Sequence, residues 1–418
     1  MIKSLSVNEY TEFFYKQEIQ SILQSPEMIR QYQLRKLDYE LLGYFNQHHQ
    51  LTCAGLVQLK PLNLGFKTAF MLNGPVGNIT DSDNLQSFLI GLQDYLKAKK
   101  NILAFHIDPY QADAEYTTQL ELVEDHLAQN TIEVLNQLGY QYQDEQVFGY
   151  VNRWIMVKDM REFNNHQEIL ASYSKQNRSR INRLEEFHLS IEELSLEDLH
   201  RFVAIERHTE ATRDFQARHE SYYRNTYEAF SQNKRVKVTI AKFNLDRYLV
   251  DLEVNLAAVS RQLDELNQEN LTPHVQKKIN VASELKKSYS SKLSKMQVLK
   301  EKYPQETVDI ATRFYLYTDK ECVALYGGSL NDFAFIPATT VLYDYIIKDT
   351  FDQGIDIYNY YGIYGNEDSL GEESPILKFK RGFGGKIYKL VGEYEIVLQP
   401  KKMSFYNTIK KVASVVKR

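Results

Sequence analysis

Hydrophobic side chains recur every third or fourth residue in two successive stretches near the middle of the chain, a spacing typical of a coiled-coil seam. The first stretch is formed by Leu249, Leu252, Leu256, Val259, Leu263 and Leu266. The second is formed by Ile279, Ala282, Leu285, Tyr289, Leu293, Met296 and Leu299. Residues 267–273 between them are mostly polar and end in Pro273, which predicts a turn. The pattern therefore predicts an antiparallel helical hairpin with arms roughly 30–45 Å long.

This predicted hairpin interrupts a globular body. Residues 236–243 and 310–317, on either side of it, are rich in β-branched and aromatic residues and predict two strands. We therefore expect an inserted arm at residues 246–307. A dimerisation zipper is one interpretation, although each seam covers only about three heptads, which is marginal between separate chains. A rigid spacer or a recognition arm for a large partner is the alternative.

The rest of the chain alternates between helical and strand periodicities, which indicates an α/β body. In a first unit, residues 1–150, we expect strands at 51–59, 69–72, 102–107 and 147–156, and helices at 7–21, 87–97 and within 115–137. In a second unit, residues 151–245 and 308–400, we expect helices at 165–187, 196–208, 218–233 and 337–351. Its further strands are expected at 189–194, 321–327 and 357–361, and residues 386–398 close the body. The order of elements is similar in the two units.

Composition excludes several classes of protein. The net charge of −5 over 418 residues is too small for a polyelectrolyte-binding protein, so any contact with nucleic acid must come from local patches. The chain has no apolar leader at its start and no apolar run long enough to span a bilayer, so we expect a cytoplasmic protein. Cys53 and Cys322 stand alone in apolar runs, which predicts reduced, buried thiols and no structural metal site.

The C-terminal segment, residues 401–418, combines a basic and an apolar side. Its lysines and arginine face no acidic residue, and Phe405, Tyr406 and Ile409 supply apolar surface. Such a basic amphipathic end suits peripheral contact with the anionic inner leaflet of a membrane. A solvated tail, or a helix packed on the body, is the equally weighted alternative.

Five short motifs follow one another in a specific order along the chain. They are Asn73-Gly74-Pro75-Val76, His106-Ile107-Asp108-Pro109-Tyr110, Tyr326-Gly327-Gly328-Ser329, the aromatic run at residues 358–363, and Leu377-Lys378-Phe379-Lys380-Arg381-Gly382-Phe383-Gly384. Together with the inserted hairpin, this set resembles the Fem aminoacyltransferases of peptidoglycan synthesis, the group of FemA, FemX and MurM. The resemblance covers nearly the whole chain. Asn73 stands where the family leads us to expect Arg, and Met28 where many members carry Trp.

The resemblance implies a fold and an activity. The fold is α/β, with two acetyltransferase-like (GNAT-like) subdomains and the hairpin inserted in the second. Such enzymes move an amino acid from aminoacyl-tRNA to the side-chain amine of the stem peptide of a peptidoglycan precursor, which builds the interpeptide bridge. The acceptor is lipid-linked or a UDP-MurNAc-pentapeptide. The implied partners are therefore aminoacyl-tRNA and a muramyl pentapeptide, and no cofactor is implied.

The implied reaction is aminolysis of an ester. An alkyl amine with a pKa of about 10.4 must lose a proton before or during attack, and the carbonyl oxygen then gains negative charge. The tRNA ester is already activated, so no covalent enzyme intermediate is needed. The sequence agrees, because it has no Gly-x-Ser-x-Gly elbow and no suggestive Cys–His spacing.

Two residues are candidates for catalysis. Asp108 ends a predicted strand, where sites of α/β proteins gather, and can hold or deprotonate the incoming amine; the alternative is an ordinary Asp-Pro turn. By resemblance, Lys380 stabilises the oxyanion or the 3′ end of the tRNA. We expect it in a loop flanked by glycines, where a solvated Lys is the alternative. Lys378 and Arg381 are its rivals.

Further residues are candidates for binding substrates. Arg213 suits bidentate contact with phosphate and, by resemblance, with the diphosphate of the acceptor; a helix-capping or surface ion-pair role is the alternative. Arg35 or Lys36 is the second candidate phosphate ligand. The candidate acceptor cleft is lined by Tyr110, Tyr326 and Tyr361, although we expect at least one of them to serve core packing.

A basic run at helical spacing is the candidate tRNA-binding patch. It consists of Lys175, Arg178, Arg180 and Arg183, with no acid before Glu185. Binding to the tRNA backbone through such a run should weaken steeply with salt. The alternative is an ordinary solvated helix face.

Two other functions are alternatives to the aminoacyltransferase reaction. An acyl-CoA-dependent acetyltransferase needs a pyrophosphate loop, and the nearest match, Arg381-Gly382-Phe383-Gly384-Gly385-Lys386, fails at its last position. Retention of CoA by the purified protein would favour this rival. A non-catalytic scaffold that dimerises through the arm is the second rival.

Overall fold

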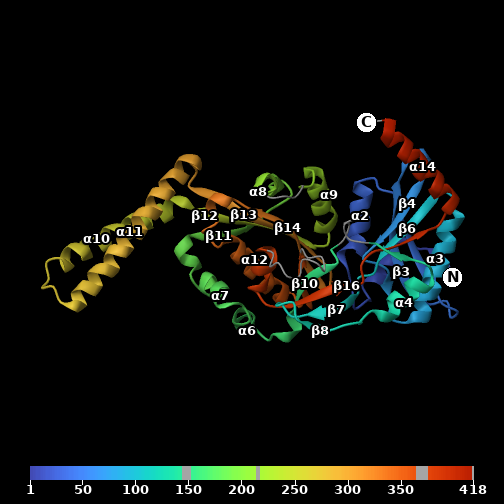
Figure 1. Ribbon diagram of the computed structural model, residues 1–418, viewed down its shortest axis with the longest axis horizontal. Helices are drawn as coiled ribbons and strands as arrows, with labels where there is room; N and C mark the ends of the chain where they lie inside the picture. Colours follow the sequence, from blue (N-terminus) through green and yellow to red (C-terminus); the bar gives the residue numbers. More distant parts are fainter. Residues whose placement is uncertain (144–151, 213–216, 364–374, 417–418) are drawn as a thin grey trace.

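Two mixed β-sheets lie next to each other, and a long helical hairpin projects from the second (Figure 1). The structure is a computed structural model, and it describes residues 1–143, 152–212, 217–363 and 375–416. The sheet near the N-terminus lies at the right of Figure 1, the second sheet lies in the centre and the hairpin lies at the left. The α/β class and the inserted hairpin are therefore as predicted.

The first sheet has the order β1-β2-β3-β4-β6-β17-β9, with β5 paired to β3. Its strands are β1 (Ile2–Ser4), β2 (Tyr39–Phe45), β3 (Leu51–Pro61), β4 (Lys67–Leu72), β5 (Val76–Gly77), β6 (Ile102–Asp108), β9 (Gln141–Tyr142) and β17 (Tyr394–Val397). Helices α3 (Ser82–Ala98) and α4 (Gln129–Gln137) bury one face, and α1 (Val7–Phe14) and α2 (Pro26–Leu34) pack on the other. Strands β4 and β6 are parallel, so their carboxyl ends meet at one edge.

The second sheet has the order β11-β12-β13-β14-β15-β10-β16-β7-β8. Its strands are β7 (Ala112–Tyr116), β8 (Leu122–Glu124), β10 (Trp154–Asp159), β11 (Leu189–Glu193), β12 (Val236–Asn244), β13 (Thr307–Tyr317), β14 (Glu321–Ser329), β15 (Ile357–Gly362) and β16 (Lys386–Leu390). Helices α8 (Leu199–Thr212) and α9 (Glu220–Ser231) cover one face and α12 (Ala338–Asp352) the other. The parallel pair β14–β15 is in register only from Glu321 to Val323.

The two sheets exchange strands across the boundaries expected at residues 150 and 308–400. Strands β7 and β8 come from the expected first unit, yet β7 pairs with β16 of the second sheet. In the other direction, β17 pairs with β6 of the first sheet. An apolar pattern predicts that a segment is a strand but does not say which sheet it joins, because pairing is non-local.

Several elements differ from those predicted. The helix expected at 165–187 is three pieces, α6 (His166–Ala171), α7 (Lys175–Asn182) and the 3₁₀ turn η4 (Leu184–Phe187). The break is explained by Ser174, whose hydroxyl caps α7 by accepting from the Asn177 N–H. Of the strand expected at 147–156, residues 147–151 lie outside the described residues, and the strand is β10 instead. The segment 115–137 starts with strand residues, and α2 and β2 were not predicted at all.

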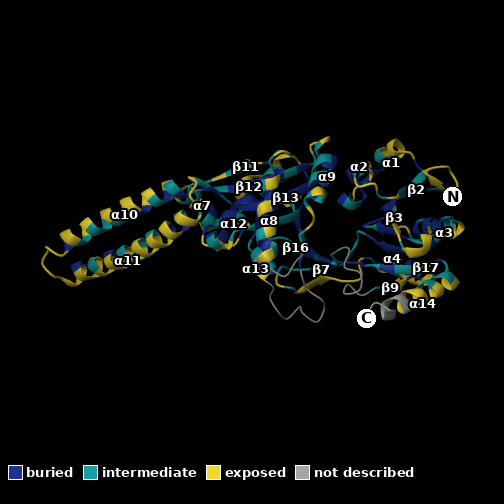
Figure 2. Cartoon of the chain, turned by 90° about the horizontal axis from the view of Figure 1, so that it is seen from above, coloured by how far each residue is buried: buried dark blue, intermediate teal, exposed yellow. Residues whose placement is uncertain are grey.

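The hairpin consists of α10 (Leu245–Leu266) and α11 (Pro273–Lys302), close to the predicted bounds. Thr272 caps α11, and Pro273 occupies its first turn, where the missing N–H costs nothing. Leu252, Ala282 and Met296 are buried along the seam, whereas the outward faces of both helices are exposed (Figure 2). Strands β12 and β13, from which the hairpin emerges, pair from Val236 to Asn244, so its base is firmly held.

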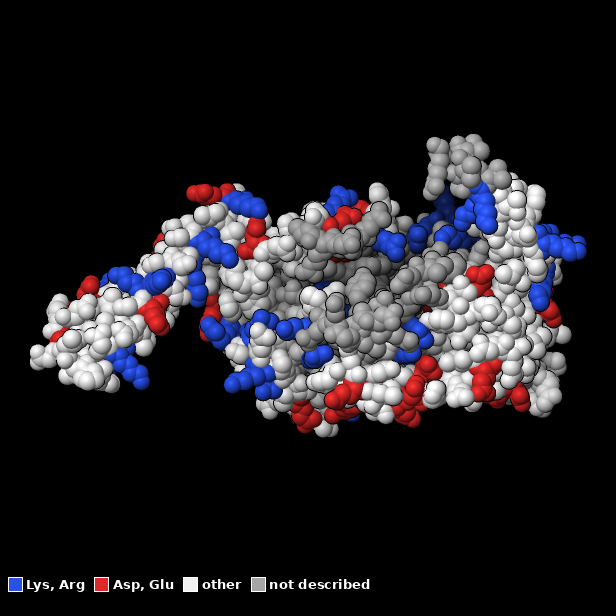
Figure 3. All heavy atoms as spheres, in the orientation of Figure 1, with Lys and Arg blue, Asp and Glu red and all other residues white. Residues whose placement is uncertain are grey.

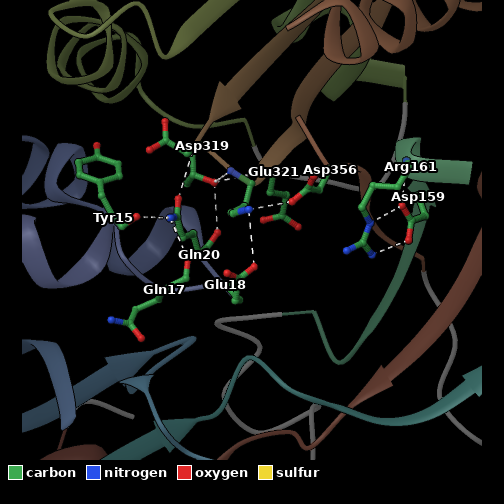
Figure 4. A network of polar contacts seen from close by, with 11 residues as sticks. Tyr15, Gln17, Glu18, Gln20, Asp159, Arg161, Asp319, Glu321 and Asp356 are labelled. Atoms are coloured by element: carbon green, nitrogen blue, oxygen red, sulfur yellow. Dashed lines mark hydrogen bonds and ion pairs between the residues drawn. The ribbon is translucent and has the colours of Figure 1, made fainter. Parts of the chain in front are cut away.

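Polar contacts join the two sheets at the loop after α1 (Figure 4). The buried amide of Gln20 donates to the carbonyls of Tyr15 (3.3 Å) and Gln17 (3.0 Å) and accepts from the Asp319 N–H (3.2 Å). Lys320 pairs with Glu18 and with Asp356. These contacts dock the N-terminal subdomain on the β13–β14 turn, which brings the end of β6 close to β14 and β15.

The chain ends in α14 (Pro400–Val416), which packs near β6. Tyr406 of this helix contacts Phe66 edge-on, with ring centroids 6.2 Å apart. Within the part of the chain that the structure describes, no helix has the length and apolarity needed to span a bilayer.

Candidate active site

Asp108 ends β6 and is almost fully buried. Its Oδ1 accepts a hydrogen bond from the Asn73 backbone N–H (3.0 Å), and its Oδ2 has no hydrogen-bond partner among the described residues. Burial, assisted by the charge of Glu393, raises the pKa of this carboxyl well above its usual range. Once ionised, Asp108 is therefore a stronger base than an exposed Asp and suits proton transfer from an amine.

Asn73 connects Asp108 to the N-terminal loop. It adopts a left-handed conformation, with a φ of 52°, which Asn tolerates better than most residues. Its side-chain amide donates to the hydroxyl of Ser21 (2.9 Å). This residue, noted above only as a departure from the family pattern, thus orients the candidate base.

A pocket lies between the two subdomains beside these residues. Its polar lining comes from both sheets and comprises Ser21, Asn73, Tyr110, Asn152, Glu321, Asn359 and Tyr361. The Tyr110 hydroxyl donates to Glu321 (2.5 Å), and the Asn359 amide donates to Glu321 (2.7 Å) and to Tyr110 Oη (2.9 Å). Burial raises the pKa of Glu321 to about 7. Glu321 and Asn359 were missed by the sequence analysis, although Asn359 is the one polar residue within the quoted aromatic run.

Tyr361 has an unusual backbone. Its φ of 63° is rare for a bulky residue, and it lies at a register shift where β15 pairs with β10. The Asn359 side chain accepts from the Tyr361 N–H (2.6 Å) and supports this conformation. The Tyr361 side chain lines the pocket, while its carbonyl and that of Gly362 accept from Lys380. Strain of this kind collects at functional sites.

Lys380 lies on α13 (Pro375–Arg381), so the prediction of a glycine-flanked loop is wrong. The residue is buried, which also excludes the alternative of a solvated Lys. Leu377 within α13 and Phe383 just after it are both buried in the same hydrophobic cluster, which holds the helix against the core. The Lys380 Nζ donates to the Gly362 carbonyl (2.7 Å) and lies 3.5 Å from that of Tyr361. Burial, together with the charge of Arg313, lowers the pKa of Lys380 to about 7. The rival Lys378 is exposed on the same helix, and Arg381 is half-buried.

The sequence analysis also missed Arg313, whose charge acts on Lys380, and Glu206, on which the charge of Arg313 acts. Arg313 of β13 lies over the Tyr343 ring (4.8 Å), and Glu206 of α8 is buried. Burial raises the pKa of Glu206 to about 7, and the charge of Arg313 opposes the shift. A Cβ atom at Gly327 would lie 2.4 Å from the Arg313 side chain, so this glycine leaves room for the guanidinium. No local motif distinguishes Arg313 or Glu206 from surface charges.

Aromatic and cationic side chains form a second cluster, outside the lining of the pocket. The Tyr222 and Tyr326 hydroxyls lie 3.0 Å apart, and the guanidinium groups of Arg35 and Arg218 lie 5.0 Å and 5.8 Å from the Tyr222 ring centre. Lys36 is exposed at a left-handed turn after α2. Arg213 lies outside the described residues. The structure thus brings Arg35, rather than Lys36, together with Tyr326.

The predicted basic run lies on and just after α7. Lys175 is exposed and Arg180 half-exposed. Arg178 donates to the carbonyls of Ala171 and Tyr173, and Arg183 forms a two-pronged pair with Glu186. Figure 3 shows Lys and Arg side chains between the base of the arm and the region of α7. Two of the four candidates are therefore already engaged within the protein.

The fold and site define a class: a two-subdomain α/β protein with a helical hairpin inserted in the second subdomain and a polar pocket between the two. A crystal structure of FemX shares this fold, with a TM-score of 0.71 at 18% identity over 97% of this chain and 99% of that chain. The predicted fold class is thereby confirmed. The FemAB family profile matches residues 5–411, and the chain belongs to the FemAB family.

Relatives of known name agree with this assignment. The chain is 23% identical over 385 residues to "Aminoacyltransferase FemA" of Staphylococcus epidermidis, covering 89% of this chain and 90% of that one. It is 24% identical over 381 residues to the FemA aminoacyltransferase of Staphylococcus aureus, covering 89% of each. The family resemblance drawn from the ordered motifs is therefore confirmed.

Proposed function

We propose that this chain is an aminoacyltransferase that moves an amino acid from aminoacyl-tRNA to the side-chain amine of a peptidoglycan stem peptide and so builds the interpeptide bridge. Membership of the FemAB family and the names of its relatives support the reaction class. The observation that carries the proposal is the placement of two buried ionisable groups around Tyr361. Tyr361 and Asn73 both line the pocket. The backbone N–H of Asn73 donates to Asp108, and the backbone carbonyl of Tyr361 contacts Lys380.

The reaction needs a base and an oxyanion partner. Asp108 takes one proton from the acceptor ammonium, and the neutral nitrogen bonds to the ester carbonyl carbon. Lys380, as an ammonium, stabilises the negative oxygen. The carbon–oxygen bond to the ribose then breaks, and the second proton lost by the nitrogen passes to the leaving ribose oxygen. Holding the two substrates in line supplies roughly 7–11 kcal/mol of the barrier, so no covalent intermediate is required.

The acceptor is proposed to extend from the pocket toward the Arg35–Tyr222–Arg218 cluster. Arginines on an aromatic ring present planar donors to phosphate oxygens, which suits the diphosphate shared by lipid-linked and UDP-linked precursors. We keep Arg213 as a third phosphate ligand by family resemblance, and Lys36 as the weaker alternative to Arg35. Tyr110, Tyr326 and Tyr361 supply the walls.

The tRNA is proposed to run from Lys380 past α7 to the arm. Lys378, Lys175 and Arg180 are the exposed or half-exposed cations near α13 and α7, and Arg381, Arg178 and Arg183 lie beside them. Helix α11 adds six lysines before Met296 against one glutamate, so the arm presents a basic side. Contacts of this type bind phosphate without reading sequence.

Peripheral membrane contact is proposed for α14. Phe405 is 57% exposed and Ile409 36% exposed, and lysines lie at positions 401, 402, 410 and 411 of the same helix. Apolar side chains flanked by lysines suit an anionic leaflet, where a lipid-linked acceptor is found.

The test is a transfer assay with the full chain. The protein is incubated with a mixed pool of charged tRNAs and, separately, with a lipid-linked or a UDP-linked pentapeptide precursor. We expect mass spectrometry to show one amino-acid residue added to the stem-peptide side chain. Precursor-independent tRNA discharge, or acylation from acyl-CoA together with calorimetric binding of CoA, would contradict the proposal.

A further inference from the structure

A line of ionisable side chains runs from Asp108 along one face of the first sheet. His106 precedes Asp108 by two residues on β6, so both side chains lie on the same face. Strand β17 pairs antiparallel with β6, placing Glu395 opposite His106 and Tyr394 opposite Ile107. Continuing this register by one residue places Glu393 opposite Asp108. Cross-strand neighbours of this kind have Cβ atoms about 4.5–5.5 Å apart.

The imidazole of His106 joins the two glutamates of this line. Its Nδ1 lies 3.0 Å from Glu393 Oε1, and its Nε2 lies 3.6 Å from Glu395 Oε2. The ring stacks on Phe70, with centroids 4.6 Å apart and planes 12° apart, which holds its orientation. The side chain of His106 is 5% exposed, and those of Glu393 and Glu395 are 16% and 18% exposed. The line thus leads from a buried carboxyl to partly exposed ones.

Other charged groups near the line are few among the described residues. Glu393 and Glu395 face His106 from β17, and Asp108 faces it from its own strand. Lys60 of β3 lies 5.9 Å from the centre of the Phe70 ring on which His106 stacks. The charge of Asp108 also contributes to the raised pKa values of Tyr32 and Tyr361, after burial.

Turnover requires an exit for a proton. Each transfer leaves Asp108 with the first proton of the acceptor ammonium, and this carboxyl is buried, with one oxygen that has no partner among the described residues. We propose that Glu393, His106 and Glu395 form a relay that returns Asp108 to its ionised state between turnovers. This inference rests on the proposed function and assigns positioning and proton-transfer roles to residues that do not touch the substrates.

The relay moves one proton from Asp108 to water in each turnover. Asp108 and Glu393 make no hydrogen bond among the described residues, so in this proposal the proton of Asp108 crosses to Glu393 through water. Glu393 passes it to Nδ1 of His106, and the imidazolium releases the proton on Nε2 to Glu395 and then to water. No bond other than O–H and N–H changes, and no oxidant or reductant is needed. Histidine suits the middle position because its two ring nitrogens can gain and lose protons near neutral pH.

The first test compares His106→Gln with the wild type in the transfer assay. Gln keeps polar contacts with the carboxylates but cannot carry a proton. We expect kcat at pH 7 to fall at least about tenfold, with KM for both substrates unchanged, because the pocket is intact. His188→Gln is the matched control, since His188 pairs with Asp251 (2.6 Å) at the base of the arm, away from the site. Unchanged kcat for His106→Gln across pH 6–8 would overturn the relay.

A second variant separates proton transfer from a structural role. His106→Ala leaves a space for free imidazole, so we expect added imidazole to raise its kcat and to leave the wild type unaffected. Glu395→Gln, at the exposed end, should make kcat depend on buffer concentration without lowering the melting temperature. A folded His106→Ala protein that imidazole does not rescue would refute the relay. A wild type without tRNA- and precursor-dependent activity would instead refute the proposed function.

Discussion

The two central side chains of the site, Asp108 and Lys380, are each driven toward the neutral form by burial. The pKa of Asp108 is raised and that of Lys380 is lowered to about 7, with Arg313 adding to the second shift. Neither has an oppositely charged partner in hydrogen-bond contact among the described residues. Such unpaired buried groups destabilise a fold and are retained at sites that use them. An incoming ammonium and a developing oxyanion would supply the missing charges.

Replacing Lys380 by Met tests the oxyanion role. Met fills a similar volume without a charge, so we expect the fold to be retained and kcat to fall about 10²–10³-fold. The transfer assay measures the loss, and circular dichroism checks the fold. Lys378→Met, on the exposed side of the same helix, is the matched control and tests the rival residue. Wild-type turnover by the Lys380→Met protein would refute the assignment.

The lowered pKa of Lys380 also predicts a pH dependence of stability. Between pH 7 and about 10.4 the unfolded chain binds a proton at Lys380 that the folded chain does not, so this residue destabilises the fold increasingly as pH falls toward 7. We expect the unfolding free energy of the wild type, relative to Lys380→Met, to rise by about 1.4 kcal/mol per pH unit between pH 8 and 9. Urea titrations of both proteins at these pH values measure the difference. Parallel pH curves would contradict the prediction.

At the scale of elements, short segments place the site residues. Tyr361 lies at the register shift near the end of β15. Its side chain lines the pocket, and its carbonyl lies 3.5 Å from the Lys380 Nζ. The parallel pairs β4–β6 and β14–β15 direct Asp108 and Glu321 to the same region from different sheets. The hairpin is the element farthest from this region, and its second helix is basic.

Charge removal on α11 tests the contact of the arm with tRNA. We expect the change of Lys277, Lys278, Lys287 and Lys292 to Gln to weaken tRNA binding and to reduce the slope of log affinity against log salt by up to about 3. All four are exposed, so the fold should not change. With saturating tRNA, kcat should equal that of the wild type. Equal salt slopes for both proteins would favour the spacer or zipper interpretation, and light scattering distinguishes those two.

At the scale of the whole molecule, a shared hydrophobic cluster and a group of polar contacts hold the two subdomains together. Side chains of α1 and α2 belong to the same hydrophobic cluster as side chains of α8, α9 and β13. The polar contacts of Gln20 and Lys320 also connect the two subdomains. Because β7 lies in the second sheet and β17 in the first, the chain passes between the two sheets more than once. The pocket therefore lies in a well-supported interface, while the arm and α14 extend to opposite ends of the molecule (Figure 1).

The position of α14 predicts how the molecule meets a membrane. We expect Phe405→Ser combined with Ile409→Ser to lower binding to vesicles that contain anionic lipid, with little change in stability, because both side chains are exposed. Co-sedimentation with anionic and with neutral vesicles measures the effect. Val298→Ser, at an exposed position on the arm, is the control. Equal sedimentation of the double variant and the wild type would contradict membrane contact through α14.

Much of this organisation was predictable from the sequence. The hairpin was, because its helical period and its turn at Pro273 are local signals. The family followed from ordered motifs, since their residues keep their order in the chain whatever the fold does. Asp108 and Lys380 belong to these motifs. Residues without a motif, such as Glu321, Arg313 and Glu206, were missed because only burial and neighbours set them apart from surface charges.

The sequence by itself determined the alternation of helices and strands, the inserted arm and the order of the motifs, because each depends on residues close together in the chain. Only the tertiary structure decided which sheet each strand joins, that Lys380 is buried on a helix, and that His106 meets Glu393 from 287 residues away. The physical reason is that strand pairing and burial depend on contacts between distant segments. Those contacts also set the pKa shifts on which the proposed chemistry depends.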